Sequence, residues 1–207
     1  MTKSIFNLKF FLFIKIFFIC FFIFSRIYAD DNKAEKDAVS IGSQEAQIKI
    51  KVFSSFTCPH CASFHIKVVP KIKKEYIDTG IVQLIFIDFP LDLAAFNASK
   101  LLHCLDKKNQ ISFLDTVYET QSKWTNGSDI NDINNNLKKI VKNLGISSAQ
   151  FDKCLVDEEI SDKILNNRVD ANKKYSINST PTIIINEKKL EGSANFENIK
   201  KKIEKLI

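Results

Sequence analysis

Two cysteines separated by two residues, Cys58 and Cys61, are the residues of this chain with the clearest chemistry. Such a pair interconverts between a dithiol and a disulfide, so the segment Cys58-Pro59-His60-Cys61 predicts a redox centre. The alternating pattern of residues 47–53 predicts a strand before it, and the apolar residues after Pro59 have helical spacing. We therefore expect Cys58 at a strand-to-helix junction, with Pro59 at the first helical position, where no N–H is needed.

This position is expected to activate the sulfur of Cys58. A thiolate at the start of a helix faces unpaired N–H groups and the positive end of the helix dipole, and a protonated His60 adds to the same field. Stabilising the thiolate stabilises the reduced form, so the disulfide of such a pair is a strong oxidant, with Cys61 as the resolving thiol. The alternative is a zinc site of Cys58, Cys61 and His60 or His65, although no second pair supplies a fourth ligand.

Residues 1–29 have the pattern of a secretory signal peptide. Their uninterrupted apolar run, residues 16–24, is about nine residues long, well short of the roughly 18 needed for a membrane span. Ala29 supplies a small residue for cleavage. An uncleaved membrane anchor is the alternative, because Ile27 is not ideal for cleavage and Lys15 interrupts the hydrophobic run.

The charge of the chain does not indicate a nucleic-acid partner. The net charge is +6, but four of these positive charges lie in residues 1–29 without any acidic residue, which leaves +2 for the remainder. The pI of about 9.0 is therefore no sign of a strongly basic surface. The remaining length of about 178 residues suits one domain, or one domain with an insertion.

The cysteine count favours an oxidising compartment. Once Cys20 is set aside with the leader, four cysteines remain, enough for the redox pair and for a structural disulfide between Cys104 and Cys154. That bond would close a loop of about 50 residues and contribute roughly 4 kcal/mol in the chain-entropy model. Two buried free thiols, packed as small apolar residues, are the alternative.

The secondary-structure patterns place a helical block inside an α/β unit. A charged linker is expected over residues 30–45, and a helix from Pro59 towards Tyr76, broken at Pro70. A buried strand over residues 81–87 follows, and strand, helix, strand in this order implies a parallel pair. Further helices are expected over residues 93–106, 111–123, 130–144, 148–155 and 158–175. A strand over residues 182–185, a turn over 186–189 and a helix over 196–206 complete the pattern.

Three motifs in this order resemble those of the DsbA-type thiol:disulfide oxidoreductases of bacterial periplasms. They are Cys58-Pro59-His60-Cys61, the Phe89-Pro90-Leu91 step into the helical block, and Thr180-Pro181-Thr182 before the last strands. The resemblance spans about residues 46–206 and implies an α/β thioredoxin fold with an inserted all-helical domain. The two parts of the thioredoxin-like domain would cover residues 46–90 and 166–207, and the insertion residues 91–165.

The resemblance also assigns a role to Thr180 and Pro181. An X-Pro bond is usually trans, whereas the resemblance implies that Thr180–Pro181 is cis and lies against the redox pair. Such a turn would leave the backbone groups of Thr180 free to pair with an extended substrate peptide. The alternative is an ordinary turn proline at the start of an edge strand.

One position departs from the pattern that the resemblance implies. Members commonly carry a buried acidic residue six positions before the first cysteine, where it helps to move protons at the resolving thiol, and here that position is Val52. Lys51 beside it is expected to point to the opposite face of the strand. Asp88 or a water molecule is a candidate replacement.

The remaining candidates have weaker signals. His65 lies one helical turn beyond Cys61, and His103 lies within the helical block, so packing or solvent contact is the default for both. Trp124 is expected in the core. Phe56 and Phe64 flank the redox turn and are candidates for an apolar surface that binds unfolded substrates.

The leading hypothesis is a periplasmic oxidase that introduces disulfide bonds into unfolded exported proteins with free cysteines. A substrate thiolate attacks Cys58, a mixed disulfide forms, and a second substrate thiol releases the reduced protein. The resemblance implies reoxidation by a membrane, quinone-linked partner of the DsbB type. No metal or organic cofactor is needed, because the cysteines carry the electrons. The alternatives are a disulfide isomerase or reductase that uses the same dithiol, and a non-catalytic chaperone-like or metal-binding module.

Overall fold

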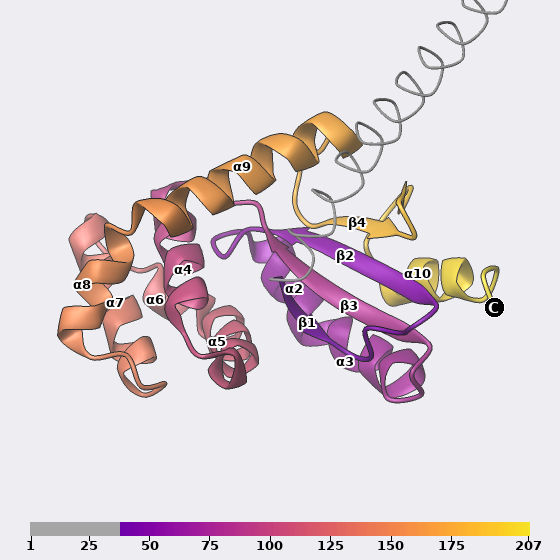
Figure 1. The fold of residues 1–207 in the computed structure, drawn as a ribbon, viewed down its shortest axis with the longest axis horizontal. Helices are drawn as coiled ribbons and strands as arrows, with labels where there is room; N and C mark the ends of the chain where they lie inside the picture. The colour runs from indigo at the N-terminus through magenta and orange to yellow at the C-terminus, as the bar shows by residue number, and fades with distance from the viewer. Residues whose placement is uncertain (1–37) are drawn as a thin grey trace, which may run out of the picture. The chain divides into compact units, whose positions relative to one another are not determined.

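The computed structural model describes residues 38–207, so the expected signal peptide and the first part of the expected linker lie outside the described residues. This part of the chain contains a sheet in the order β1-β3-β2-β4-β5, with a block of helices to its left in the view of Figure 1. Strands β2 and β3 are parallel, and the other neighbours are antiparallel. The bounds of the strands are β1 Val39–Ile41, β2 Ile48–Ser54, β3 Val82–Asp88, β4 Thr182–Ile185 and β5 Lys188–Lys189.

Strand β1 corrects the linker prediction. Residues 30–45 were expected to be a linker, but Val39–Ile41 pair with β3 at the edge of the sheet. A strand of three residues is too short to show a period, and its pairing partner lies more than 40 residues further along the chain.

A helical crossover joins β2 to β3, as the sequence predicts. Helix α2 covers Pro59–Lys67, α3 covers Val69–Ile72, and a π-helical turn, η1, covers Lys73–Ile77. The break falls at Val68, just before Pro70, because proline lacks the N–H that a continuous helix needs at that position. The prediction of a helix broken near Pro70 is confirmed.

The inserted helices follow β3, and several of them begin at side-chain caps. Asp92 caps α4 by accepting the backbone N–H of Ala95 at 2.8 Å, and Ser147 and Gln150 form a capping box at α8. The helices α8 and α9 and the strand β4 have the bounds that the sequence predicts. The helical bounds are α4 Leu93–Cys104, α5 Lys107–Glu119, α6 Gln121–Trp124, α7 Ile130–Lys142, α8 Ser148–Leu155, α9 Glu158–Tyr175 and α10 Phe196–Ile203.

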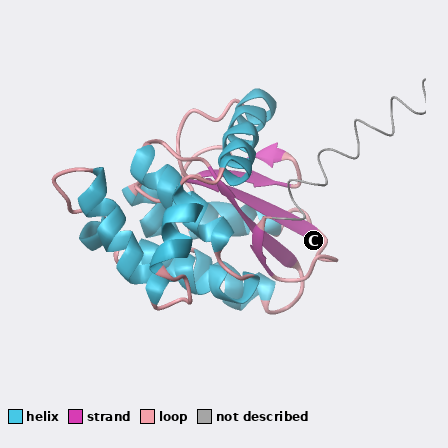
Figure 2. Ribbon diagram, turned by 60° about the vertical axis from the view of Figure 1, so that its left-hand side comes forward, coloured by secondary structure: helices cyan, strands magenta, loops and turns pink. Residues whose placement is uncertain are grey.

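One hydrophobic core extends from the sheet into the helical block. Ile50 and Val52 of β2 belong to the same buried cluster as Phe113, Trp124 and Leu137 of the inserted helices. The other face of the sheet buries a smaller cluster, which includes Phe53, Ala171 of α9 and Ile184. Helices therefore lie on both sides of the sheet (Figure 2). The α/β thioredoxin-like fold with inserted helices is confirmed.

Helix α9 connects the insertion with the second part of the thioredoxin-like domain. It runs without a break through residues 165 and 166, where the sequence analysis placed the end of the insertion. It contacts both α4 of the insertion and β3 of the sheet. The domain limits drawn from the sequence therefore divide a continuous helix and a continuous core.

A buried lysine on β2 faces α9. Lys51 points away from Val52, as expected, and pairs with Glu187 in the turn between β4 and β5. Tyr175 donates to the same carboxylate at 2.6 Å, and Lys174 lies 2.9 Å from it. Burial alone would raise the pKa of Glu187, but the hydrogen bonds from these three groups outweigh it and lower this pKa from 4.5 to about 2.

Glu187 is therefore expected to stabilise the fold at neutral pH and to lose this effect in acid. A carboxyl whose pKa is lower in the folded state stabilises it above pH 4.5, and the contribution disappears as the pH falls towards 2. For Glu187→Gln we expect a loss of about 1 kcal/mol at pH 7, limited by solvent screening because half of the side chain is exposed. Thermal melts from pH 7 to pH 2 would measure it, with the exposed Glu191→Gln as the control. A melting temperature that differs from wild type equally at pH 7 and pH 2 would contradict this role.

Candidate active site

The redox turn joins the end of β2 to the start of α2. Cys58 is the N-cap of α2, with φ of −78° and ψ of 118°, and Pro59 occupies the first turn of the helix. The Cys58 carbonyl accepts the backbone N–H groups of Cys61 at 3.1 Å and Ala62 at 3.2 Å. The cysteine sulfur thus lies at the helix N-terminus, as the sequence predicts, because an extended strand leads directly into a proline-initiated helix.

The two cysteines differ in their exposure. Cys58 is 8% exposed and Cys61 only 1%, and both are free thiols. Burial raises the pKa of the Cys61 thiol to about 12, although the neighbouring polar groups of the Thr180 side chain and the Ser55 backbone act in the opposite direction. An incoming sulfur therefore reaches Cys58 first, and Cys61 holds its proton at neutral pH. Pro59 and His60 lie between them and are exposed.

A loop from the far end of the chain lies against Cys58. The Thr180–Pro181 bond is cis, and the thiol of Cys58 donates to the Thr180 carbonyl, with sulfur and oxygen 3.3 Å apart. The antiparallel pairing of β4 with β2 sets Thr182 opposite Phe53 and so brings the loop to the redox turn. The two segments that the sequence analysis singled out therefore form one site.

The face of the sheet that carries Val52 also carries a partly buried acid, on the next strand. Asp88 pairs in register with Ser54, two residues beyond Val52 and on the same face. Its carboxylate accepts from Ser99 at 2.7 Å and lies 2.7 Å from Nε2 of His103. The side chains of Asp88 and His103 are 11% and 13% exposed. Ser99 and His103 lie four residues apart and therefore on the same face of α4. This spacing is the one feature of the sequence that could have indicated that both side chains contact the same residue.

His65 lies on the buried face of the redox helix α2. Its Nε2 lies 2.7 Å from a carboxylate oxygen of Asp115 on α5, and its ring lies 4.9 Å from that of Tyr118. The buried side chain of His65 thus ties α2 to α5. Residues 38–207 contain no group of three or more His, Cys, Asp or Glu side chains placed to hold a metal ion.

The prediction that Phe56 and Phe64 form an exposed apolar surface is wrong. They are 2% and 4% exposed, and the ring of Phe56 contacts Tyr118 at 5.2 Å. The insertion covers them, which a local pattern cannot indicate. Leu91 and Leu93, at 51% and 56% exposure, are the large apolar side chains that reach solvent in the step into α4.

Two further side chains hold the redox turn and were not found from the sequence. Gln121 donates from its amide to the carbonyls of Phe56 at 2.7 Å and Cys58 at 3.0 Å. Asp92 accepts from the Thr57 hydroxyl at 2.6 Å. Both residues come from the insertion: Gln121 begins α6 and Asp92 is the N-cap of α4. They lie far from the redox turn in the sequence, so no local sequence pattern indicates these contacts.

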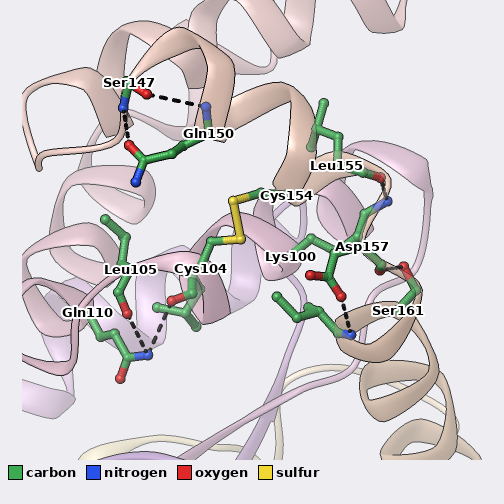
Figure 3. The surroundings of a disulfide bond; sticks show 12 residues. Lys100, Cys104, Leu105, Gln110, Ser147, Gln150, Cys154, Leu155, Asp157 and Ser161 are labelled. Carbon is green, nitrogen blue, oxygen red and sulfur yellow. Dashed lines mark hydrogen bonds between the residues drawn. A yellow bond between two sulfur atoms is a disulfide. The ribbon is translucent and has the colours of Figure 1, made fainter.

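A disulfide joins Cys104 and Cys154 (Figure 3). Their Cα atoms are 6.1 Å apart, and the bond links the last residue of α4 to α8. Beside it, Lys100 donates to the carbonyl of Leu155. The disulfide therefore links two of the inserted helices covalently, through residues 50 positions apart in the sequence.

A CxxC pair at the start of a helix, on a thioredoxin-like sheet and beside a cis-proline loop, defines a thiol:disulfide oxidoreductase. A family model described as thioredoxin matches residues 33–205. This chain belongs to that family, in its DsbA-like branch, and is a protein-disulfide oxidoreductase with Cys58 and Cys61 as its CxxC pair.

Known relatives agree with this assignment. A probable disulfide bond formation protein D of Bacillus cereus is 32% identical over 80% of this chain and 77% of the relative. Disulfide bond formation protein D of Bacillus subtilis is 28% identical over 84% and 85% of the two chains. The crystal structure of alpha-DsbA1 from Wolbachia pipientis has a TM-score of 0.74 and 31% identity, and the match covers 82% of this chain and 90% of that one.

Proposed function

We propose that this protein is the oxidase form of its family and introduces disulfide bonds into exported proteins. The observation that carries the proposal is the position of Cys58 at the N-terminus of α2, with Cys61 buried behind it. A helix N-terminus favours the thiolate and thereby the reduced form, so the Cys58–Cys61 disulfide is a ready oxidant. Two relatives named for disulfide bond formation support this direction of the reaction.

The reaction proceeds by two exchanges of sulfur. A substrate thiolate attacks Sγ of Cys58 in the disulfide form, the bond to Cys61 breaks, and Cys61 leaves as a thiolate. Because the pKa of Cys61 is raised to about 12, this sulfur takes up a proton. A second substrate thiolate then attacks its own sulfur in the mixed disulfide, Cys58 leaves as a thiolate, and the substrate is oxidised by two electrons.

The cis-proline loop binds the substrate peptide in this scheme. The Thr180 carbonyl already accepts from the Cys58 thiol, so a backbone paired with Thr180 would pass directly beside the reacting sulfur. Such backbone pairing does not depend on the side chains of the substrate, which suits an enzyme that acts on many unfolded chains.

The two-electron reaction requires a reoxidant, which we propose is a membrane, quinone-linked protein of the DsbB type. We further propose that the enzyme acts in the periplasm, either free or held by an uncleaved leader. The proposed oxidising reaction and the leader-like residues 1–29 support this location. Within residues 38–207, no helix is long and apolar enough to cross a bilayer.

The equilibrium of the Cys58/Cys61 pair with glutathione tests the oxidase assignment against the isomerase or reductase alternative. Alkylation and mass spectrometry would follow this pair separately from Cys104 and Cys154. We expect a potential closer to the roughly −120 mV of DsbA than to the roughly −270 mV of thioredoxin. A thioredoxin-like potential would contradict the oxidase assignment and favour a reductase or isomerase.

A further inference from the structure

Side chains of the insertion hold the backbone that leads from β2 into the redox turn. The amide of Gln121 bonds the carbonyls of Phe56 and Cys58, at 2.7 Å and 3.0 Å, and so spans Thr57 between them. Asp92 bonds the hydroxyl of Thr57. The backbone that leads into Cys58 is thus fixed by residues that lie outside the strand–turn–helix unit.

The orientation of the Gln121 amide follows from its partners. Both partners are carbonyl oxygens, which only accept, so the amide must present its NH₂ group to them. Gln121 begins α6, and Trp124 at the end of this short helix is 2% exposed. The Trp124 indole donates to the Val117 carbonyl at 2.8 Å. The amide is therefore placed by a packed aromatic anchor.

This contact bears directly on the reacting residue. The Cys58 carbonyl accepts the first helical N–H groups, from Cys61 and Ala62, and Gln121 adds a third donor. Holding that carbonyl fixes the direction of the first turn of α2 relative to the sulfur of Cys58. The positive end of the α2 dipole and the positive NH₂ end of the Gln121 amide dipole then both favour negative charge at the turn.

We infer that Gln121 is a positioning residue for the exchange at Cys58: it fixes the redox turn from the inserted helices and favours the thiolate form. The inference rests on the redox role of the pair proposed above. It extends the function of the insertion from covering the site to setting its reactivity.

Three variants separate positioning from simple structural support. Gln121→Glu keeps the size, removes the donors and adds a negative charge at the turn. Gln121→Met keeps the length and removes the donors without adding charge. Ser122→Glu adds the same charge at the neighbouring exposed residue and serves as the control.

The readout is the equilibrium constant of the Cys58/Cys61 pair with glutathione, measured with thermal unfolding of each variant. We expect Gln121→Glu to make the disulfide about tenfold harder to reduce, because a negative charge beside the turn disfavours the Cys58 thiolate. For Gln121→Met we expect a smaller shift in the same direction, and for Ser122→Glu a shift below about twofold.

Each outcome decides the inference. Lower melting temperatures with wild-type equilibrium constants for both Gln121 variants would show a structural role alone and overturn it. If Ser122→Glu shifts the equilibrium constant as much as Gln121→Glu does, the added charge alone explains the effect, without any contact to the turn. That result would also overturn the inference. If Gln121→Glu does not fold, Gln121→Met decides. A thioredoxin-like equilibrium constant for the wild-type protein would refute the oxidase proposal but not the inference about Gln121. The ratio of the equilibrium constants of variant and wild type still tests the role of Gln121.

Discussion

The variant Cys58→Ser is expected to lose thiol-oxidising activity by about 10³-fold or more. A hydroxyl neither forms a disulfide nor leaves from one, so neither exchange step can occur at this position. Cys61 cannot replace it, because it is 1% exposed and its pKa is raised to about 12. The measurement is the rate at which a reduced peptide with two cysteines is oxidised under a glutathione redox buffer.

The companion variant Cys61→Ser has a different expected result. Cys58 remains able to attack a disulfide, but the resolving thiol is gone, so a mixed disulfide with the substrate should accumulate. Mass spectrometry of the trapped species would identify Cys58 as the linked residue. Both variants should melt near the wild-type reduced protein, which excludes misfolding as the cause. Undiminished function of Cys58→Ser would instead favour the non-catalytic chaperone-like alternative.

Removal of the second disulfide is expected to have the largest effect on stability. The Cys104–Cys154 bond closes a loop of 50 residues, and the chain-entropy model assigns such a loop about 4 kcal/mol. For the double variant Cys104→Ala, Cys154→Ala we expect the melting temperature to fall by roughly 10 °C, given the entropy of unfolding of a domain of this size. Alanine leaves no unpaired polar group at the partly buried position 104 or at the buried position 154.

The oxidation state of the Cys58/Cys61 pair must not contribute to this comparison of melting temperatures. Melts in a Cys58→Ala, Cys61→Ala background, with and without reductant, remove any contribution from the first pair. Reductant should then lower the melting temperature of the chain that retains Cys104 and Cys154, and leave the chain without them unchanged. A loss below about 3 °C would mean that the packing of the helices suffices without the bond.

The elements whose patterns are local were predicted well. Helices α8 and α9 and strand β4 have the predicted bounds, because capping residues and apolar periods lie within each segment. The start of α5 was placed four residues too late, at Ile111 and not at Lys107, because the charged first turn carries no apolar period. The short strand β1 was missed because it depends on pairing with β3.

The sequence by itself determined the redox pair, its position at a strand-to-helix junction, and the order of the strands and helices that follow β1. These features depend on neighbouring residues, whose spacing reports the local backbone directly. Only the tertiary structure decided which distant groups meet at the site. The approach of Thr180 to Cys58 follows from the pairing of β4 with β2, and the bonds from Gln121 follow from the packing of α6. Such contacts join residues more than 60 positions apart, and folding alone brings them together.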